Sequence, residues 1–186
     1  FCELIENKSK FIGSGLIGKS RDDFLLEVKK IASEHPTASH IAFAYQLKTE
    51  NGVDLYFNDD GEPSGTAGRP LLTIIESKNL VNTGLAVVRY YGGINLGTGG
   101  LTRAYSKAGM KTFTNSIIER YIHFSNYKLV INYNVLDRLT NVIYRSKGTI
   151  LDKVFTDKVI VHISIPTIAE KIIREEFKMI DMTLIN

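Results

Sequence analysis

The residues best able to do chemistry lie between Asp59 and Lys111, where an acidic segment is followed by a basic one. Between Lys48 and Arg69 every charged residue is an acid, namely Glu50, Asp54, Asp59, Asp60 and Glu62. From Ser77 to Ile118 every charged residue is a base, namely Lys78, Arg89, Arg103, Lys107 and Lys111. Clustered cations set the local potential even when the whole chain carries only +3, so the second segment is predicted to bind an anion.

Glycines crowd the start of the basic segment: Gly92, Gly93, Gly97, Gly99 and Gly100. A helix predicted to begin near residues 98–101 would point its unpaired amides and positive dipole end at this loop, which suits phosphate or carboxylate. Three cations follow at a spacing of four residues and share one helix face. The glycines could equally form only a tight connection, and the cations a solvated face.

Two aromatic residues stand beside the loop. Tyr90 and Tyr91 could stack on bases, or one could lie in the core and the other on the surface. The predicted anion- or nucleic-acid-binding residues are Arg69, Arg89, Tyr90, Gly92, Gly93, Gly97, Thr98, Gly99, Gly100, Arg103, Lys107 and Lys111.

The acidic turn, DDGEPSGTAG, has a second set of polar groups: Asp59, Asp60, Glu62, Ser64 and Thr66. Their oxygens could bind Mg²⁺ or Ca²⁺. The favoured interpretation is that the carboxylates bond the backbone of SGTAG or pair with Arg69, Arg89 or Arg103, because aspartates in turns usually bond their own backbone. No metal or other cofactor is therefore expected.

Proton transfer could involve His40, Asp60 or Glu62, although a lone histidine at the start of an apolar strand is more often a hydrogen-bonded core residue. Ser64 lacks the G-x-S-x-G pattern of a serine hydrolase. Residues 13–20 satisfy the Walker A expression G-x-x-x-x-G-K-[ST]. Only Phe11 and Ile12 precede the first glycine, so this segment is predicted to be a strand rather than a phosphate-binding loop.

The runs DDGEPSGTAGRP and VVRYYGGINLGTGGLTRAY resemble the signature of the YigZ/IMPACT family, and HPTASHIAFAY resembles its histidine segment. The resemblance extends from about Lys8 to the C-terminus. Asn95 stands where many members have lysine, which weakens a cationic role for this position. Ile41-Ala42-Phe43 replaces the usual His/Asn-Cys-Trp pattern, which argues against a cysteine-dependent reaction.

The resemblance implies a bacterial, cytoplasmic protein of two α+β domains and no particular catalytic activity. Residues 1–123 would resemble domain 2 of ribosomal protein S5, a fold shared with RNase PH and elongation factor G domain IV. Residues 124–186 would form a ferredoxin-like βαββαβ domain, with a shortened last strand at residues 182–185. Eukaryotic relatives regulate translation initiation through a kinase-activating partner, using a separate domain.

The residue pattern agrees with two α+β domains. The first is predicted to contain strands at 11–17, 41–47, 53–57 and 85–89. Its helices are predicted from Ser20, as N-cap, toward Glu34, from Pro70, and from about Leu101 to Arg120. A tight turn is expected at Glu50-Asn51-Gly52.

The pattern restarts after His123 with strands at 127–133, 150–155, 159–165 and 182–185. A helix opened by Asn134 follows the first of these strands. A second helix, 168–179, is expected behind a capping box of Thr167 and Glu170.

Composition sets the remaining limits. With 44% hydrophobic and 23% charged residues the chain is of ordinary globular composition. No apolar run reaches the roughly 18 residues of a membrane span. The single cysteine, Cys2, excludes internal disulfides and fits a reducing compartment. Because the numbering starts at Phe1 and not at methionine, we expect the natural chain to begin upstream.

Two functions remain open from the sequence. One is a non-catalytic, translation-associated protein that binds RNA, the ribosome or a translation-related protein through the glycine loop and basic helix. The other is an enzyme on a small phosphorylated or carboxylated substrate held by the same loop. The enzyme requires a closed pocket with a carboxylate within reach. The oligomeric state is not predictable from these residues.

Overall fold

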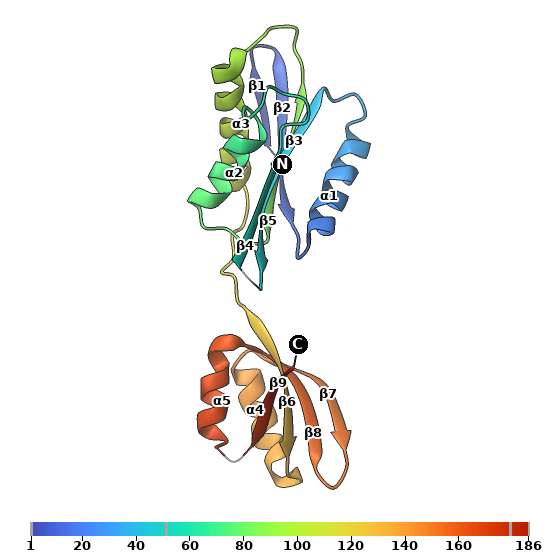
Figure 1. The fold of residues 1–186 in the computed structure, drawn as a ribbon, viewed down its shortest axis with the longest axis vertical. Coiled ribbons are helices and arrows are strands. Elements are labelled where there is room, and N and C mark those ends of the chain that lie inside the picture. Colours follow the sequence, from blue (N-terminus) through green and yellow to red (C-terminus); the bar gives the residue numbers. More distant parts are fainter. Residues whose placement is uncertain (1, 51, 179, 186) are drawn as a thin grey trace. The chain divides into compact units, whose positions relative to one another are not determined.

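The computed structural model describes residues 2–50, 52–178 and 180–185. The chain divides into two compact units, Phe1–Glu119 and Arg120–Asn186. Both are built of helices packed on an antiparallel sheet, so the fold class is α+β (Figure 1).

The first unit has five strands and three helices. In chain order they are β1 Cys2–Glu6, β2 Ser9–Ile17, α1 Arg21–Glu34, β3 His40–Thr49, β4 Gly52–Asn58, α2 Gly68–Ser77, β5 Thr83–Tyr90 and α3 Gly97–Thr114. The sheet order is β1-β2-β5-β3-β4, with every neighbouring pair antiparallel.

Helices cover both faces of this sheet (Figure 1). Helices α2 and α3 pack on one face, around Phe11, Leu85 and Tyr105, and α1 packs on the other through Phe24, which stacks on Tyr45. The central strand β5 is therefore apolar on both sides and is buried from Gly84 to Arg89.

The second unit has four strands and four short helical segments. In chain order they are β6 Phe124–Ile131, the 3₁₀ turn η1 Tyr133–Val135, α4 Leu136–Arg145, β7 Thr149–Phe155, β8 Val159–Pro166, the 3₁₀ turn η2 Thr167–Ala169, α5 Glu170–Glu176 and β9 Asp181–Ile185. The sheet order is β7-β8-β6-β9. Buried and partly exposed residues alternate along β8, because one core, formed with α4 and α5, lies on one face of the sheet.

Local signals predicted most element positions correctly. Ser20 caps α1, and its side chain and that of Asp23 form a reciprocal capping box. Residues 13–17 of the Walker-like segment lie in β2, so the strand interpretation is confirmed. The hairpin of β3 and β4 is confirmed with Gly52 at φ +142, while Asn51 lies outside the described residues.

Three element predictions were wrong. Helix α3 ends at Thr114 instead of Arg120, because the amides of Asn115 and Ser116 bond back three residues and tighten the last turn. Strand β6 ends at Ile131, and α4 begins at Leu136 behind a 3₁₀ turn, so Asn134 is not its cap.

The expected capping box at Thr167 and Glu170 is also absent. The Thr167 hydroxyl bonds the side chains of His123, just before β6, and of Ser125 on β6. The Glu170 carboxylate accepts from Tyr127 and Arg174. The side chains of Thr167 and Glu170 are therefore bonded to other side chains and do not cap the helix. Met179, at the end of the helix expected here, lies outside the described residues.

Candidate functional site

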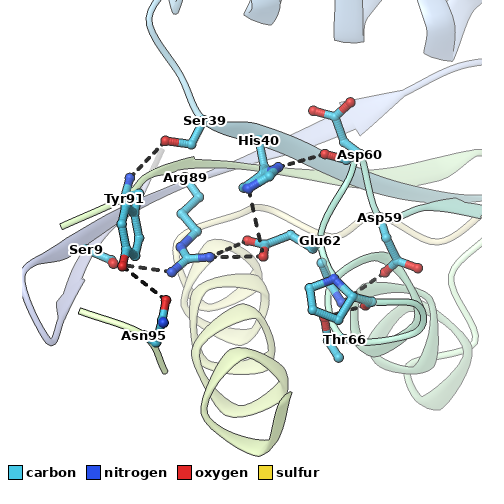
Figure 2. A network of polar contacts seen from close by, with 12 residues as sticks. Ser9, Ser39, His40, Asp59, Asp60, Glu62, Thr66, Arg89, Tyr91 and Asn95 are labelled. Carbon is cyan, nitrogen blue, oxygen red and sulfur yellow. Dashed lines mark hydrogen bonds and ion pairs between the residues drawn. The ribbon is translucent and has the colours of Figure 1, made fainter. Parts of the chain in front are cut away.

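The first unit contains both groups of residues singled out by the sequence. The acidic turn, residues 59–66, lies between β4 and α2, and the glycine loop, residues 92–100, follows β5 and includes the first turn of α3. Strand β5 provides Arg89, whose side chain meets Glu62 of the acidic turn inside the unit (Figure 2). Helix α3 provides Tyr105, whose hydroxyl bonds the same carboxylate.

Asp59 organises the acidic turn. Its carboxylate accepts hydrogen bonds from the backbone N–H groups of Gly65 at 2.8 Å, Ala67 at 3.0 Å and Gly68 at 2.7 Å. Two of these amides lie at the start of α2, where no helical carbonyl can reach them. Asp59 therefore stabilises the turn and the start of the helix. The predicted bonding of a turn carboxylate to the backbone of SGTAG is confirmed.

Asp60 joins the same turn to β3. Its carboxylate accepts the N–H of Ile41 at 2.6 Å, and its carbonyl lies 2.8 Å from Nδ1 of His40. Because a carbonyl only accepts, Nδ1 of His40 must carry the proton. In the neutral ring the lone pair is then on Nε2.

Glu62 is the buried acid of the turn, and its side chain is 3% exposed. Nη1 of Arg89 donates to both carboxylate oxygens, at 2.7 and 3.0 Å, and the Tyr105 hydroxyl donates to one of them at 2.8 Å. Nε2 of His40 lies 4.0 Å from the other oxygen. This is a desolvated ion pair with a third partner, and removing one member would leave a buried charge uncompensated.

Of the two roles predicted for Arg89, pairing with a carboxylate of the acidic turn is confirmed by its contact with Glu62, whereas its burial disagrees with a surface contact to phosphate. The residue is 5% exposed, and its guanidinium lies 5.6 Å from the ring centre of Phe11 and 5.4 Å from that of Tyr91. Its Nη2 lies 3.5 Å from the hydroxyl of Ser9, and in the part of the chain that the structure describes its Nε has no hydrogen-bond partner. The expected surface contact of Arg89 with phosphate does not match this placement.

Burial also acts on Tyr105. Loss of hydration, together with the adjacent Glu62 carboxylate, raises the pKa of the Tyr105 phenol above its ordinary value of 10. The phenol is therefore held as a neutral donor.

The remaining residues of the acidic turn have local partners or none. The hydroxyl of Thr66 donates to the carbonyl of Pro63, and Ser64 is exposed. Among residues 2–50, 52–178 and 180–185, no group of three or more His, Cys, Asp or Glu side chains could hold a metal ion.

Tyr90 and Tyr91 differ in burial, as predicted by the alternative that placed one in the core and the other on the surface. Tyr90 is partly buried, and its hydroxyl lies 2.8 Å from Nδ1 of His35. Tyr91 is 48% exposed, and its hydroxyl donates to Oδ1 of Asn95 at 3.0 Å. Asn95 thus supports the Tyr91 ring, which covers Arg89 (Figure 2).

The glycine loop has two kinds of glycine. Gly93 and Gly97 have positive φ angles, +81 and +66, which side chains disfavour. Gly92 has the backbone of Lys8, in the turn between β1 and β2, where a Cβ would be. Its amide donates to the hydroxyl of Ser9 at 3.1 Å. The loop is therefore packed on that turn.

Helix α3 begins at Gly97, and the N-cap residue Leu96 provides no side-chain hydrogen bond. Thr98 and Gly99 are exposed in its first turn, together with the partly exposed Gly100. The first-turn amides are thus without a side-chain cap, which agrees with the expected anion-binding geometry without testing it.

The three cations of α3 lie beside β1. The ammonium of Lys107 is 3.5 Å from the carboxylate of Glu6, and that of Lys111 donates to the carbonyl of Glu3. Arg103 is exposed, makes no ion pair or hydrogen bond with any described residue, and extends back toward Gly99. The carboxylate of Glu6 therefore offsets part of the basic stripe, while that of Glu3 pairs with Lys10 and Arg103 has no ion-pair partner among the described residues.

Arg69 stands apart from this stripe. It is exposed in the first turn of α2, and its guanidinium lies 5.9 Å from the ring centre of Phe57 on β4. No described contact joins it to the glycine loop.

A groove of about 270 Å³ lies between α3 and the turn that joins β1 to β2. Arg103, Lys107 and Gly100 line it from the helix, and Glu6 and Asn7 line it from the turn. None of His40, Asp60 and Glu62 belongs to its lining. We call this feature the α3 groove.

Sequence reasoning missed several residues of these sites. Tyr105 and Ser9 complete the buried cluster, and Glu6 and Asn7 form one wall of the α3 groove. One local signal was available, since Asn7 and Lys8 between two strands are typical of a two-residue hairpin turn, and both have positive φ angles.

Fold and site together define an α+β protein of two units with a buried Arg–Glu–Tyr cluster and an adjacent basic groove. The sequence profile of the Impact N-terminal domain matches residues 7–113, a span that contains every residue of the acidic turn and the glycine loop. The chain belongs to the IMPACT family, as the resemblance predicted.

Two relatives illustrate the similarity. IMPACT family member YigZ of Escherichia coli K12 is 31% identical over 157 residues, covering 84% of this chain and 76% of that protein. An IMPACT family member of Haemophilus influenzae is 36% identical over 149 residues, covering 80% of this chain and 72% of that protein.

A solved structure is also similar. A crystal structure described as that of a hypothetical protein has a TM-score of 0.72 and 26% identity, covering 100% of this chain and 93% of its own. In the described part of our structure, no helix has the length and apolar character needed to cross a membrane.

Proposed function

We propose that this protein is a non-catalytic, translation-associated regulator that binds RNA, free or within the ribosome, through the α3 groove and the glycine loop. The observation that carries the proposal is the exposed guanidinium of Arg103, which lies at a groove and has no partner among the described residues. A free cation at an uncapped helix start suits a phosphate backbone.

The binding surface is narrower than the full set of sequence-predicted residues. It comprises Arg103, Lys107 and the backbone of residues 97–100, together with Lys8, which is exposed in the turn that packs on Gly92. Arg89 is assigned a structural role, because its charge is already offset by Glu62.

The association with translation and the cytoplasmic location rest on the family resemblance. The finer fold assignments belong to the same proposal, with an S5 domain 2-like first unit and a ferredoxin-like second unit. The βαββαβ order and the sheet order β7-β8-β6-β9 support the second assignment.

The test is binding of a fluorescent, unstructured RNA across a salt series. Arg103→Ala with Lys107→Ala should weaken binding at low salt by about tenfold or more. The decline of the logarithm of the binding constant with the logarithm of salt concentration should become shallower by about 1.4, or 0.7 for each lost phosphate contact. The matched control is Lys29→Ala with Lys158→Ala, which removes the same charge from two exposed positions outside the α3 groove. Equal loss in both double variants would show unspecific attraction and refute the groove.

A second function is favoured by one observation. His40 is a part-exposed histidine with its Nδ1 proton held by a carbonyl and its Nε2 facing the Glu62 carboxylate at 4.0 Å, an arrangement able to move a proton. The protein would then be an enzyme on a small phosphorylated or carboxylated substrate. Because none of His40, Asp60 and Glu62 lines the α3 groove, the groove geometry favours binding over catalysis.

Turnover of a panel of small phosphorylated and carboxylated compounds, followed by mass spectrometry, tests the enzyme. Activity that disappears in His40→Ala but persists in His35→Ala would establish it. Absence of turnover by the unaltered protein would remove this alternative.

A further inference from the structure

The α3 groove has walls of more than one chemical kind. Leu96 and Gly100 give it an apolar side, Arg103 and Lys107 a cationic rim, and Glu6 and Asn7 a polar edge. A site for phosphate alone would gain nothing from a carboxylate, since like charges repel. The Glu6 carboxylate suits a neutral ligand group with N–H donors, and the apolar side formed by Leu96 and Gly100 suits a flat ring.

We propose that the α3 groove holds one unpaired nucleobase, with guanine preferred, while Arg103 contacts the flanking phosphate or stacks on the base. This inference rests on the proposed RNA binding and adds to it the base that is recognised. Single-stranded RNA is commonly read through bases that are splayed out and bonded on their Watson–Crick edge, with arginine planes among the stacking partners.

The size of the groove agrees with a single base. Its volume of about 270 Å³ lies just below the range of about 300 to 1,000 Å³ typical of pockets for drug-sized ligands. A base fits such a space, whereas a duplex does not enter it.

Guanine is preferred because of the Glu6 carboxylate. Guanine has two adjacent N–H donors, N1–H and the N2 amino group, on one edge, and they match the two acceptor oxygens of a carboxylate. Adenine and cytosine present one amino group there, and uracil presents one N–H between two acceptors. The Glu6 side chain is 41% exposed, and Lys107 contacts only its Oε2, at the long distance of 3.5 Å, while Oε1 has no hydrogen-bond partner among the described residues.

The neighbouring Asn7 can add to the contact. Its side chain makes no hydrogen bond with any described residue, and it has both donor and acceptor groups to offer the guanine O6 or a ribose hydroxyl. The positive φ of Asn7, +44, holds it at the tip of the hairpin beside Glu6.

The experiment compares seven-residue RNAs with one central base, UUUGUUU, UUUAUUU, UUUCUUU and UUUUUUU, by fluorescence anisotropy at low salt. The unaltered protein should bind the guanine oligomer roughly 5- to 150-fold more tightly than the uridine oligomer, as for one bidentate base contact. Glu6→Gln should remove most of this preference, measured as the ratio of the affinities for the guanine and uridine oligomers within the same variant. Glu3→Gln, with the same charge change on the same strand outside the groove, should keep the preference.

The outcomes separate the two proposals. Absence of binding to any oligomer, or binding unaffected by Arg103→Ala, would overturn the proposed function. Binding that depends on Arg103 but is equal for all four oligomers would leave the proposed function standing and overturn the base site. A guanine preference that survives in Glu6→Gln would also overturn the base site as described.

Discussion

Replacing Glu62 by glutamine should be the most damaging single isosteric change in the first unit. The change keeps the shape of the side chain and removes its charge, while the Arg89 guanidinium stays buried beside it. Breaking a buried ion pair from one side costs about 3 to 5 kcal/mol, because the remaining charge has lost its compensation. Two short bonds from Nη1, at 2.7 and 3.0 Å, place this pair among the well-formed ones.

Urea unfolding measures the effect. With a slope of about 2 kcal/mol per molar urea, a loss of about 4 kcal/mol lowers the midpoint of the first unit by about 2 M. Because the chain has two units, unfolding of the first unit should be monitored by a signal that reports on that unit alone, such as amide exchange in β5.

The matched control is Glu27→Gln, which breaks the exposed pair of Glu27 and Lys30. Exposed pairs contribute about 0 to 1 kcal/mol, so this variant should unfold close to the unaltered protein. If Glu62→Gln and Glu27→Gln shift the urea midpoint equally, the claim that removing one member of the buried Arg89–Glu62 pair is strongly destabilising is wrong.

Three further predictions concern stability. Because burial raises the folded-state pKa of Tyr105, its stabilising effect is fully present below pH 10 and is lost as the pH rises further, where the phenol of the unfolded chain ionises first. Tyr105→Phe, which lacks the hydrogen bond to Glu62, should therefore be less stable at neutral pH but lose less stability above pH 10 than the unaltered protein, which pH-dependent circular dichroism will show. Hydrogen bonding from Tyr127 lowers the pKa of Glu170, so its stabilising effect is present above pH 4.5 and is lost as the pH falls through the folded value; Glu170→Gln should flatten the acid unfolding of the second unit. Gly92→Ala should lower stability by about 1 to 3 kcal/mol, because its methyl group would overlap the backbone of Lys8. Thermal unfolding will measure the loss, with Gly99→Ala as the control, because a Cβ at Gly99 meets only Nη1 of Arg103 at 3.6 Å.

Much of the fold could be predicted because its signals are local. The capping box of Ser20 and Asp23 joins residues three positions apart, and the β3–β4 hairpin joins neighbouring strands across a short turn. Such contacts depend mainly on residues that are close together in the chain, so a sequence pattern can predict them. The same logic failed at Thr167, whose hydroxyl found partners 42 and 44 residues away.

The site was predictable in composition but not in arrangement. Sequence spacing singled out the acidic turn and the glycine loop, and the predicted bonding of the turn carboxylates to backbone amides and to an arginine is confirmed at Asp59 and Glu62. It could not assign Arg89 to the interior, because burial depends on α3 and on the acidic turn packing against β5.

By itself, then, the sequence determined most of the helices and strands, though not β1, together with the segregation of acids from bases and the family. Only the tertiary structure decided that Glu62 meets Arg89 across 27 residues and Tyr105 across 43, and that Arg103 remains exposed at a groove completed by Glu6. The physical reason is that local hydrogen bonds are specified by neighbouring residues, whereas the desolvation and pairing of a charge depend on every segment that packs around it.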